Sequence, residues 1–144
     1  MEKSLIIIKP DGVERKLIGE IIGRYEKKGF RIIAAKMLHP ERSILEMHYA
    51  EHIDKPYFAE LIRYMAEGYL MVMAIEGENV IEIIRLMNGH KDPKQALPGT
   101  IRGDFAHSIT KNIIHASDSP KTAAREIQIW FPELTSPKNL NISM

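Results

Sequence analysis

Apolar residues along this chain form two patterns that alternate from the N-terminus onward. Continuously apolar runs are typical of strands buried on both faces, and apolar spacings of three and four residues are typical of helices with one buried side. The runs predict strands at residues 5–8, 30–38, 70–75 and around 113–114. The spacings predict helices at residues 17–25, 44–52, 57–67, 80–87 and 120–130.

Glycines and small polar residues mark where these helices begin and end. Gly29, Gly68 and Gly89 each follow a helical run and are expected to end it, because glycine adopts the left-handed conformation at low cost. Asn79 is expected to cap the helix that follows it. A serine or aspartate directly before Pro120 is expected to cap the last helix.

Strands that alternate with helices predict a sheet covered by helices, of either the α/β or the α+β class. Periodicity alone leaves a doubly wound sheet and a ferredoxin-like sheet open. The pattern lapses at residues 90–111, which hold Pro93, Pro98, Gly99 and Gly103. A loop of this length inside a compact domain is typically functional.

Length and composition narrow the function classes. The 144 residues are expected to form one domain, 1–144, and the net charge of +1 argues against a dedicated nucleic-acid-binding protein. The absence of cysteine excludes disulfides and thiolate chemistry. The apolar run at residues 69–75 is too short to cross a membrane, so we expect a cytoplasmic protein with no membrane partner. The polar tail after Pro132 is expected to lie over the surface or over a neighbouring subunit.

His115 ends a short apolar run and is followed by Ser117, Asp118, Ser119 and Pro120, a sequence that favours the start of a helix. The histidine should therefore lie where a strand gives way to a helix N-terminus. Free backbone N–H groups and the positive end of the helix dipole favour anions such as phosphate at that place. Histidine can act as a nucleophile, an acid or a base, although a lone histidine at a strand end is more commonly structural.

Phosphate binding, if present, depends on side chains, because the chain lacks both the GxxxxGK[ST] loop and the GxGxxG turn. Lys9, Arg85 and Arg102 are the candidates, although each alone is typical of a solvated surface charge. Glu126 lies on the last helix, at the border of its buried side. Its carboxylate could accept a hydrogen bond from His115 and orient the ring, whereas the alternative is a surface ion pair of little worth.

A zinc site is a competing hypothesis. Residues 48–52 read HYAEH, which matches the H-x-x-E-H pattern of inverted zinc peptidases. On one helix, His48 and His52 would lie one turn apart with Glu51 beside them. The pattern is short and its third ligand is unassigned, so the zinc peptidase is the weaker hypothesis.

Three blocks carry a family resemblance: IIIKPDGV at residues 6–13, PGTIRGDF at 98–105 and NIIHASDS at 112–119. In this order and spacing they resemble the nucleoside diphosphate kinase family, and the resemblance extends from the first strand to Phe131. It implies an α+β fold, a ferredoxin-like sandwich in which helices cover a four-stranded antiparallel sheet. It also implies a ping-pong reaction that moves the γ-phosphoryl group of a nucleoside triphosphate to a nucleoside diphosphate.

The resemblance also implies roles for particular residues. His115 would be the nucleophile and become a phosphohistidine, with its ring oriented by Glu126 and Ser117. Lys9, Arg85 and Arg102 would bind the phosphates, and Lys9 and Asn112 would bind the sugar hydroxyls. Tyr49 would lie near His115 and Lys9.

The same resemblance implies where the base and the metal bind and how copies of the chain assemble. The base would stack on Tyr57, at the family's usual phenylalanine position, in a slot lined by Leu61 and Ile109. Mg²⁺ would bridge the phosphates, with Asp118 reaching it through water. The partners would be nucleoside tri- and diphosphates and further copies of the chain, in a hexamer rather than a tetramer.

The chain departs from the family pattern at a few positions. Lys91 stands where the family usually carries a phosphate-binding threonine, and lysine could donate to phosphate as a charged group. Ala116 replaces the common glycine, and Thr110 and Lys111 replace the common Gly-Arg pair. The change at Lys91 leaves open a second hypothesis, a binding module that keeps the nucleotide site without turnover.

Overall fold

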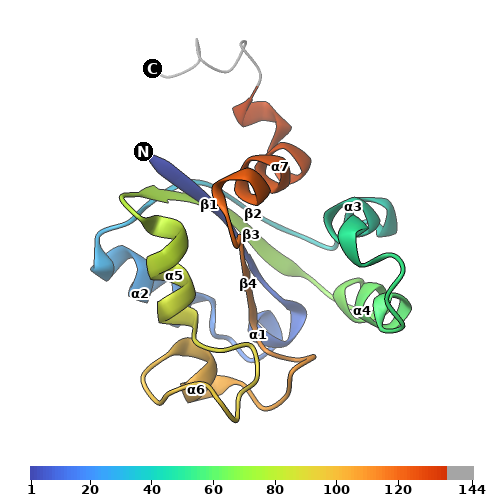
Figure 1. Cartoon of the computed structure of the whole chain (residues 1–144), viewed down its shortest axis with the longest axis horizontal. Helices are drawn as coiled ribbons and strands as arrows, with labels where there is room; N and C mark the ends of the chain where they lie inside the picture. Colours follow the sequence, from blue (N-terminus) through green and yellow to red (C-terminus); the bar gives the residue numbers. More distant parts are fainter. Residues whose placement is uncertain (136–144) are drawn as a thin grey trace.

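The computed structural model describes residues 1–135, and its centre is a four-stranded antiparallel sheet (Figure 1). The strands stand in the order β2-β3-β1-β4. Their bounds are β1 (Glu2–Ile8), β2 (Arg31–Leu38), β3 (Leu70–Gly77) and β4 (Ile114–Ala116). In the register of β1 with its two neighbours, Ile6 lies opposite Met73 of β3, and Ile7 lies opposite His115 of β4.

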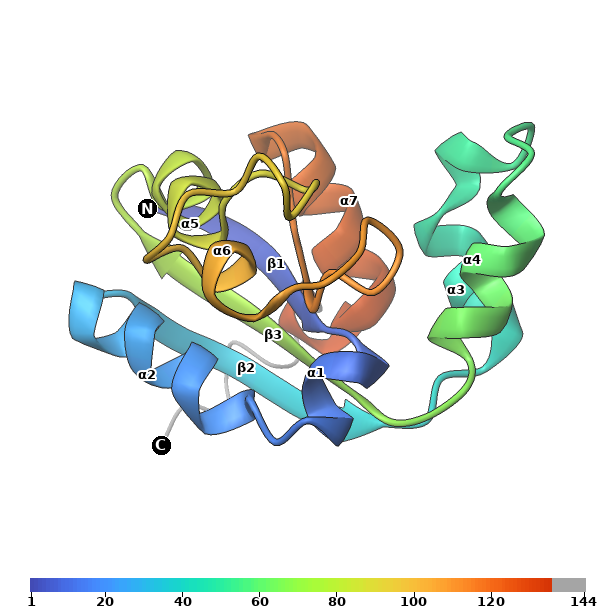
Figure 2. The same cartoon turned by 90° about the horizontal axis from the view of Figure 1, so that it is seen from below.

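Helices cover both faces of the sheet. Their bounds are α1 (Pro10–Glu14), α2 (Ile18–Lys28), α3 (Arg42–His48), α4 (Phe58–Met65), α5 (Val80–Asn88), α6 (Ile101–Phe105) and α7 (Pro120–Trp130), with 3₁₀ turns η1 (Ala50–His52) and η2 (Pro132–Leu134). In Figure 2, α3 and α4 stand together beyond one end of the strands, while α2 and α5 lie over the sheet.

The central strand β1 explains why two cores form. All four residues from Leu5 to Ile8 are completely buried, because alternate side chains point to opposite faces. Ile6 and Ile8 pack in a cluster that includes residues of α2 and α5. Leu5 and Ile7 pack in a second cluster that includes residues of α3, α4 and α7. Burial of each such side chain contributes about 1.5–3 kcal/mol to the stability of the fold. The strand therefore holds Lys9, the residue directly after it, in a fixed position.

The predicted fold class is confirmed, and so is each of the four predicted strands. Ser119 caps α7 as expected, since its hydroxyl accepts from the N–H of Thr122 at 3.1 Å. The prediction that Asn79 caps α5 through its side chain is wrong. Asn79 adopts a left-handed conformation with φ 55°, and Glu2 instead accepts from the N–H of Ile81 at 3.0 Å.

Three further differences concern helices. Residues 10–14, for which no helix is expected, form the short helix α1, because Pro10 begins it at a position where proline is well tolerated. The expected loop at 90–111 contains α6, which Thr100 caps by accepting from the N–H of Gly103. The helix expected at 44–52 ends at His48, after which the backbone turns at Tyr49 into η1.

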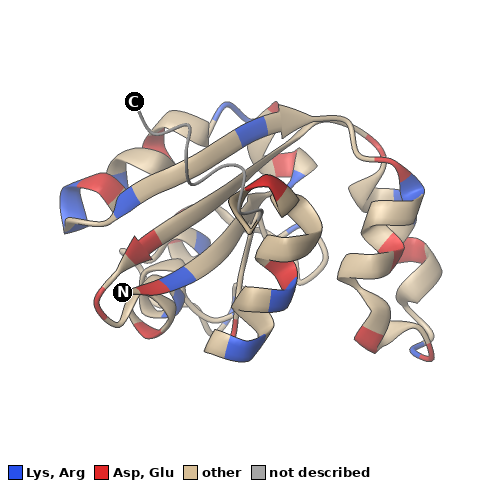
Figure 3. Cartoon of the chain, turned by 90° about the horizontal axis from the view of Figure 1, so that it is seen from above, with Lys and Arg blue, Asp and Glu red and all other residues tan. Residues whose placement is uncertain are grey.

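The C-terminal tail is described only in its first residues. Glu133 pairs with Lys36 of β2 at 3.6 Å, and residues 136–144 lie outside the described part, so the expectation for them stays a prediction. Within residues 1–135, no helix is long and apolar enough to cross a bilayer. Several helices carry both acidic and basic residues (Figure 3).

Candidate active site

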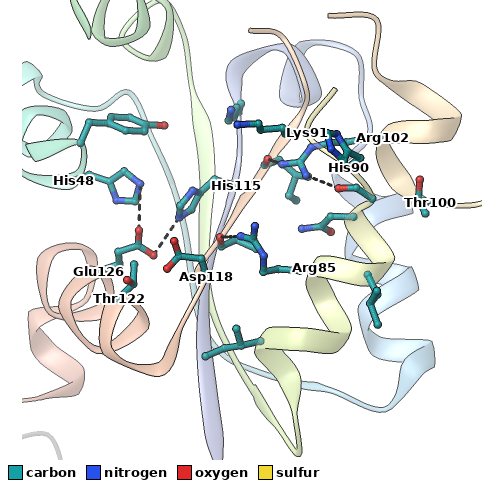
Figure 4. Close-up of a pocket in the computed structure, with 18 of the residues that line it drawn as sticks. His48, Arg85, His90, Lys91, Thr100, Arg102, His115, Asp118, Thr122 and Glu126 are labelled. Atoms are coloured by element: carbon teal, nitrogen blue, oxygen red, sulfur yellow. Dashed lines mark hydrogen bonds and ion pairs between the residues drawn. The ribbon is translucent and has the colours of Figure 1, made fainter. Parts of the chain in front are cut away.

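His115 is the middle residue of β4 and lies half-buried at the edge of the sheet. Pairing with β1 places it opposite Ile7, and the chain then turns through Ser119 into α7. The predicted position between a strand and a helix N-terminus is therefore confirmed. The ribbon of β4 and the N-terminal end of α7 frame the histidine in Figure 4.

A buried carboxylate holds one nitrogen of this histidine. Nε2 of His115 lies 3.1 Å from Oε1 of Glu126, whose side chain is only 4% exposed. Ser117 donates from Oγ to the same oxygen at 2.7 Å and accepts from the N–H of Leu5 at 2.9 Å. A carboxylate accepts only, so Nε2 carries the hydrogen and Nδ1 keeps a lone pair. The structure thus brings the histidine and the glutamate together, and the alternative of a surface ion pair for Glu126 is wrong.

Lys9 follows β1 directly and lies in a buried polar cluster. Its Nζ donates to Oδ1 of Asn112 at 2.8 Å, and Nδ2 of Asn112 donates to the carbonyl of Lys91 at 3.2 Å. Burial, together with the nearby charge of Arg102, lowers the pKa of Lys9 to about 8, while Asp11 acts in the opposite direction. A lysine in this setting gains from an approaching anion, because a phosphate would offset the cost of its burial.

Arg102 extends from α6 into the same region and is tied to the backbone. Its Nε donates to the carbonyl of Asn112 at 3.2 Å, Nη1 donates to Gly89 at 2.8 Å, and Nη2 donates to Ile114. Burial lowers its pKa to about 10, and the charge of Arg85 acts in the same direction. This arginine therefore joins three segments of the chain and adds positive charge beside them.

A strained turn precedes the histidine. Ile113 has φ 76°, and the N–H of Ile114 donates to the carbonyl of Asn112 at 2.8 Å, which is the geometry of a positive-φ γ-turn. The carbonyl of Ile113 accepts from the N–H of Lys9 at 2.7 Å. A β-branched residue in this conformation costs about 1–3 kcal/mol and persists because these contacts fix it. Around this turn the carbonyls of Asn112 and Ile114 accept from Arg102, and the carbonyl between them accepts from Lys9.

These residues surround a cavity of about 1050 Å³ (Figure 4). Predicted site residues that line it are Lys9, Tyr49, Tyr57, Leu61, Arg85, Lys91, Arg102, His115, Asp118 and Glu126. Asn112 and Ser117 lie behind the wall and hold residues that line it. Ile109 is 58% exposed and is not among the lining residues. The hydroxyl of Tyr57 lies 2.8 Å from Nδ1 of His52, which fixes the ring at the mouth of the cavity.

The geometry argues against the zinc peptidase hypothesis. Nδ1 of His48 faces the indole of Trp130 at 3.0 Å, whereas Nδ1 of His52 faces Tyr57. Within residues 1–135, three side chains bring possible metal-ligand atoms within 4.8 Å of one another, namely His48, His115 and Glu126. His52 is not one of them. The end of α3 at His48 is the physical reason, because the two histidines do not share a helix.

Sequence reasoning considered His48 only as a zinc ligand, and it missed the contact of this residue with His115. The rings of His48 and His115 pack edge to face with centroids 4.6 Å apart. Thr122 of α7 also lines the cavity beside Asp118 and was not anticipated. A signal for His48 existed, since it follows the buried Leu45 at helical spacing and so falls on the buried side of α3.

Replacing Arg102 with lysine is expected to lower the free energy of unfolding by about 2–3 kcal/mol, because an ammonium group cannot reach three separated carbonyls and at least one buried carbonyl loses its partner. Denaturant unfolding measures this. The matched control is Arg15→Lys, since Arg15 holds a single carbonyl, that of Phe105, at an exposed position. Equal stability of the Arg102 variant and the wild type would contradict the bracing role.

Comparison with known proteins identifies the family. Residues 2–135 match the family described as "Nucleoside diphosphate kinase". A nucleoside diphosphate kinase of Thermoanaerobacter sp. (strain X514) is 58% identical over 93% of this chain and 99% of that protein, and one of Archaeoglobus fulgidus is 48% identical over 92% and 88%. The crystal structure of nucleoside diphosphate kinase from Encephalitozoon cuniculi superposes with a TM-score of 0.91 at 40% identity, covering 95% of this chain and 93% of that one. The chain belongs to the nucleoside diphosphate kinase family.

Proposed function

We propose that this protein is a nucleoside diphosphate kinase that transfers the γ-phosphoryl group of a nucleoside triphosphate to a nucleoside diphosphate through a phosphohistidine on His115. One observation carries the assignment of the nucleophile. Glu126 engages Nε2 of His115, which leaves the lone pair of Nδ1 at the wall of a cavity lined by Lys9, Arg85 and Arg102. This arrangement combines an oriented nucleophile with positive charge for phosphate.

The reaction then proceeds in two half-reactions. In the first, the Nδ1 lone pair of His115 attacks the γ-phosphorus, the bond to the oxygen of the β-phosphate breaks, and the diphosphate leaves with that electron pair. In the second, an oxygen of the acceptor diphosphate attacks the phosphohistidine and the P–N bond breaks. Lys9, Arg85 and Arg102 neutralise charge on the phosphate oxygens, which is most of what phosphoryl transfer requires.

The sugar and base are bound by neighbouring residues in this proposal. Lys9 and Asn112, already joined by a hydrogen bond of 2.8 Å, bind the sugar hydroxyls. The base stacks on Tyr57, which is 47% exposed at the cavity mouth, against Leu61. The exposed apolar Ile109, which lies outside the cavity lining, completes the slot in this proposal. Stacking with few contacts to base edges accepts every base, which suits this reaction. The buried hydroxyl of Tyr49 also lines the cavity, near the reacting atoms.

Mg²⁺ is the metal that we propose accompanies the nucleotide. Asp118 is exposed and lines the same cavity as Arg85 and Arg102, so it is available to a hard cation on the phosphates. Mg²⁺ is commonly held by one carboxylate, waters and substrate phosphates, and Asp118 fits that role through water. When bound, the ion supplies neutralisation of phosphate charge. The nitrogen donors of His48 and His115 suit softer metals and are not its ligands.

Replacing Lys91 with threonine is expected to raise the KM for ATP by about three- to tenfold at low ionic strength while leaving kcat nearly unchanged. Lys91 is exposed and lines the cavity, so it acts as a mobile charge that attracts the phosphates. The effect should shrink at high ionic strength, because salt screens exposed charges. Steady-state kinetics at the two ionic strengths measure it, with Lys94→Thr as the control on the same loop. A loss confined to kcat would contradict this role.

We also propose the following setting for the enzyme. Residues 1–144 form a single kinase domain in the cytoplasm, with no membrane partner and no dedicated nucleic-acid site, which the net charge of +1 supports. The chain forms a homo-oligomer, and a hexamer is preferred over a tetramer. Within residues 1–135, β2 is an edge strand of the sheet and carries the half-exposed Met37, which supports an assembly of copies.

The decisive test is a pulse of γ-labelled ATP with magnesium, followed by analysis of the protein for acid-labile, base-stable phosphate. The expected result is label on His115, which is then removed as labelled GTP when GDP is added. Nucleotide binding without any label would overturn the proposal and favour a binding module that has lost turnover.

A further inference from the structure

His48 is a buried histidine that the proposed reaction does not use. It is the last residue of α3, and its side chain is only 1% exposed. Nδ1 of its ring faces Trp130 of α7. Glu126 and His115 lie beside the ring as well (Figure 4). The residue therefore lies beside the nucleophile and its carboxylate, in the lining of the same cavity.

Trp130 fixes the position of the hydrogen on this ring. An indole nitrogen donates only, and it lies 3.0 Å from Nδ1 of His48, so Nδ1 must be the acceptor. Burial, and next the neighbouring His115, hold the pKa of His48 well below its ordinary value, so the ring is neutral. A neutral imidazole with a bare Nδ1 carries its hydrogen on Nε2.

This hydrogen faces the catalytic carboxylate. Nε2 of His48 lies 3.8 Å from Oε2 of Glu126, which is longer than a hydrogen bond but orients the positive end of the N–H toward the oxygen. The other oxygen, Oε1, already contacts Ser117 and His115. The carboxylate thus has polar neighbours at both of its oxygens.

The same logic argues against a metal in this cluster. A metal needs a lone pair from each ligand, yet Nε2 of His48 carries a hydrogen where it faces Glu126 and His115. To turn a lone pair toward a metal, the ring would have to give up the hydrogen bond from Trp130 and leave a buried indole N–H unpaired.

We propose that His48 is a positioning residue, whose Nε2–H, directed by Trp130, restrains Glu126 so that the glutamate holds His115 with Nδ1 free for phosphoryl transfer. The inference rests on the proposed function. It predicts a loss in kcat and not in nucleotide binding, because His48 contacts the groups that orient the nucleophile and not the cavity mouth where Tyr57 lies.

Two amide substitutions of His48 distinguish the roles of its two ring nitrogens. In His48→Gln the amide nitrogen lies near the place of Nε2 and still faces Glu126. In His48→Asn the side chain can accept from Trp130 but is too short to reach the carboxylate. We expect His48→Gln to keep kcat within about threefold of the wild type and His48→Asn to lose about tenfold or more, with KM unchanged in both. Thermal unfolding of both variants separates these effects from misfolding.

Equal losses in the two variants, or a loss that appears only in KM, would overturn the positioning role. A measurement on the unchanged protein does not depend on folding of the variants. In ¹⁵N NMR of the histidine rings, His48 should show a protonated Nε2 and a bare Nδ1, and a protonated Nδ1 would overturn the proposal. If the wild type forms no phosphohistidine, the proposed function fails; if it turns over and the amides do not differ, only this inference fails.

Discussion

Replacing His115 with alanine is expected to abolish the phosphoenzyme and to lower kcat by at least about 10⁴-fold. The reason is that no other group can take over the covalent step. Oε1 of Glu126 would still accept from Ser117, but it would have no ring to orient, and the cations at the cavity would bind nucleotide without an attacking atom. Labelled ATP and steady-state transfer to GDP measure the two losses.

Folding of this variant should be close to that of the wild type. The ring of His115 is half-buried at the sheet edge, and the hydrogen bonds of β4 to β1 are made by the backbone. The matched control is His107→Ala, since His107 is exposed and lies outside the cavity lining. Stable label on the alanine variant would place the nucleophile elsewhere and contradict the proposal.

The sheet could be predicted from the sequence because its information is local. The run from Leu5 to Ile8 is apolar throughout, and only a strand buried on both faces uses such a run efficiently. Ser119 and Pro120 gave the start of α7 for the same reason, since a cap needs only residues a few positions away. The antiparallel, ferredoxin-like arrangement of the strands came from the family resemblance, because periodicity does not report which strands pair.

What could not be predicted depends on distant partners. Asn79 resembles a cap, but Glu2, far away in the chain, supplies the carboxylate instead. The strained conformation of Ile113 runs against the preference of a β-branched residue, and hydrogen bonds from Lys9 and Ile114 are what hold it.

In the candidate site, too, local features could be predicted and contacts between distant residues could not. His115 and Lys9 stood out because each follows an apolar run and adjoins turn residues. For His48 the helical spacing signalled burial and the metal pattern was misleading, but neither indicated Trp130, because that contact joins residues 82 positions apart. Long-range contacts that set a tautomer leave no periodic trace in a sequence.

Replacing Lys9 with methionine is expected to lower kcat/KM by about 10²–10³-fold and, at the same time, to stabilise the fold by about 1 kcal/mol near neutral pH. Burial lowers the pKa of Lys9 from its ordinary 10.5 to about 8, so the folded protein bears the cost of a buried charge. Methionine removes that cost, although it also loses the hydrogen bond to Asn112. Activity falls because a phosphate-binding charge is gone.

The pH dependence of this stability difference tests its origin. Below pH 8 Lys9 is protonated in both the folded and unfolded chains, so the full cost is present. Between pH 8 and 10.5 the unfolded chain binds more protons, and the wild type gains stability as pH rises. The methionine variant lacks this gain, so its advantage should shrink across that window. Denaturant unfolding of both proteins, with Lys111→Met as the exposed control, measures the difference. An advantage that grows with pH, or a variant less stable at neutral pH, would show that Lys9 is not held at the cost of stability.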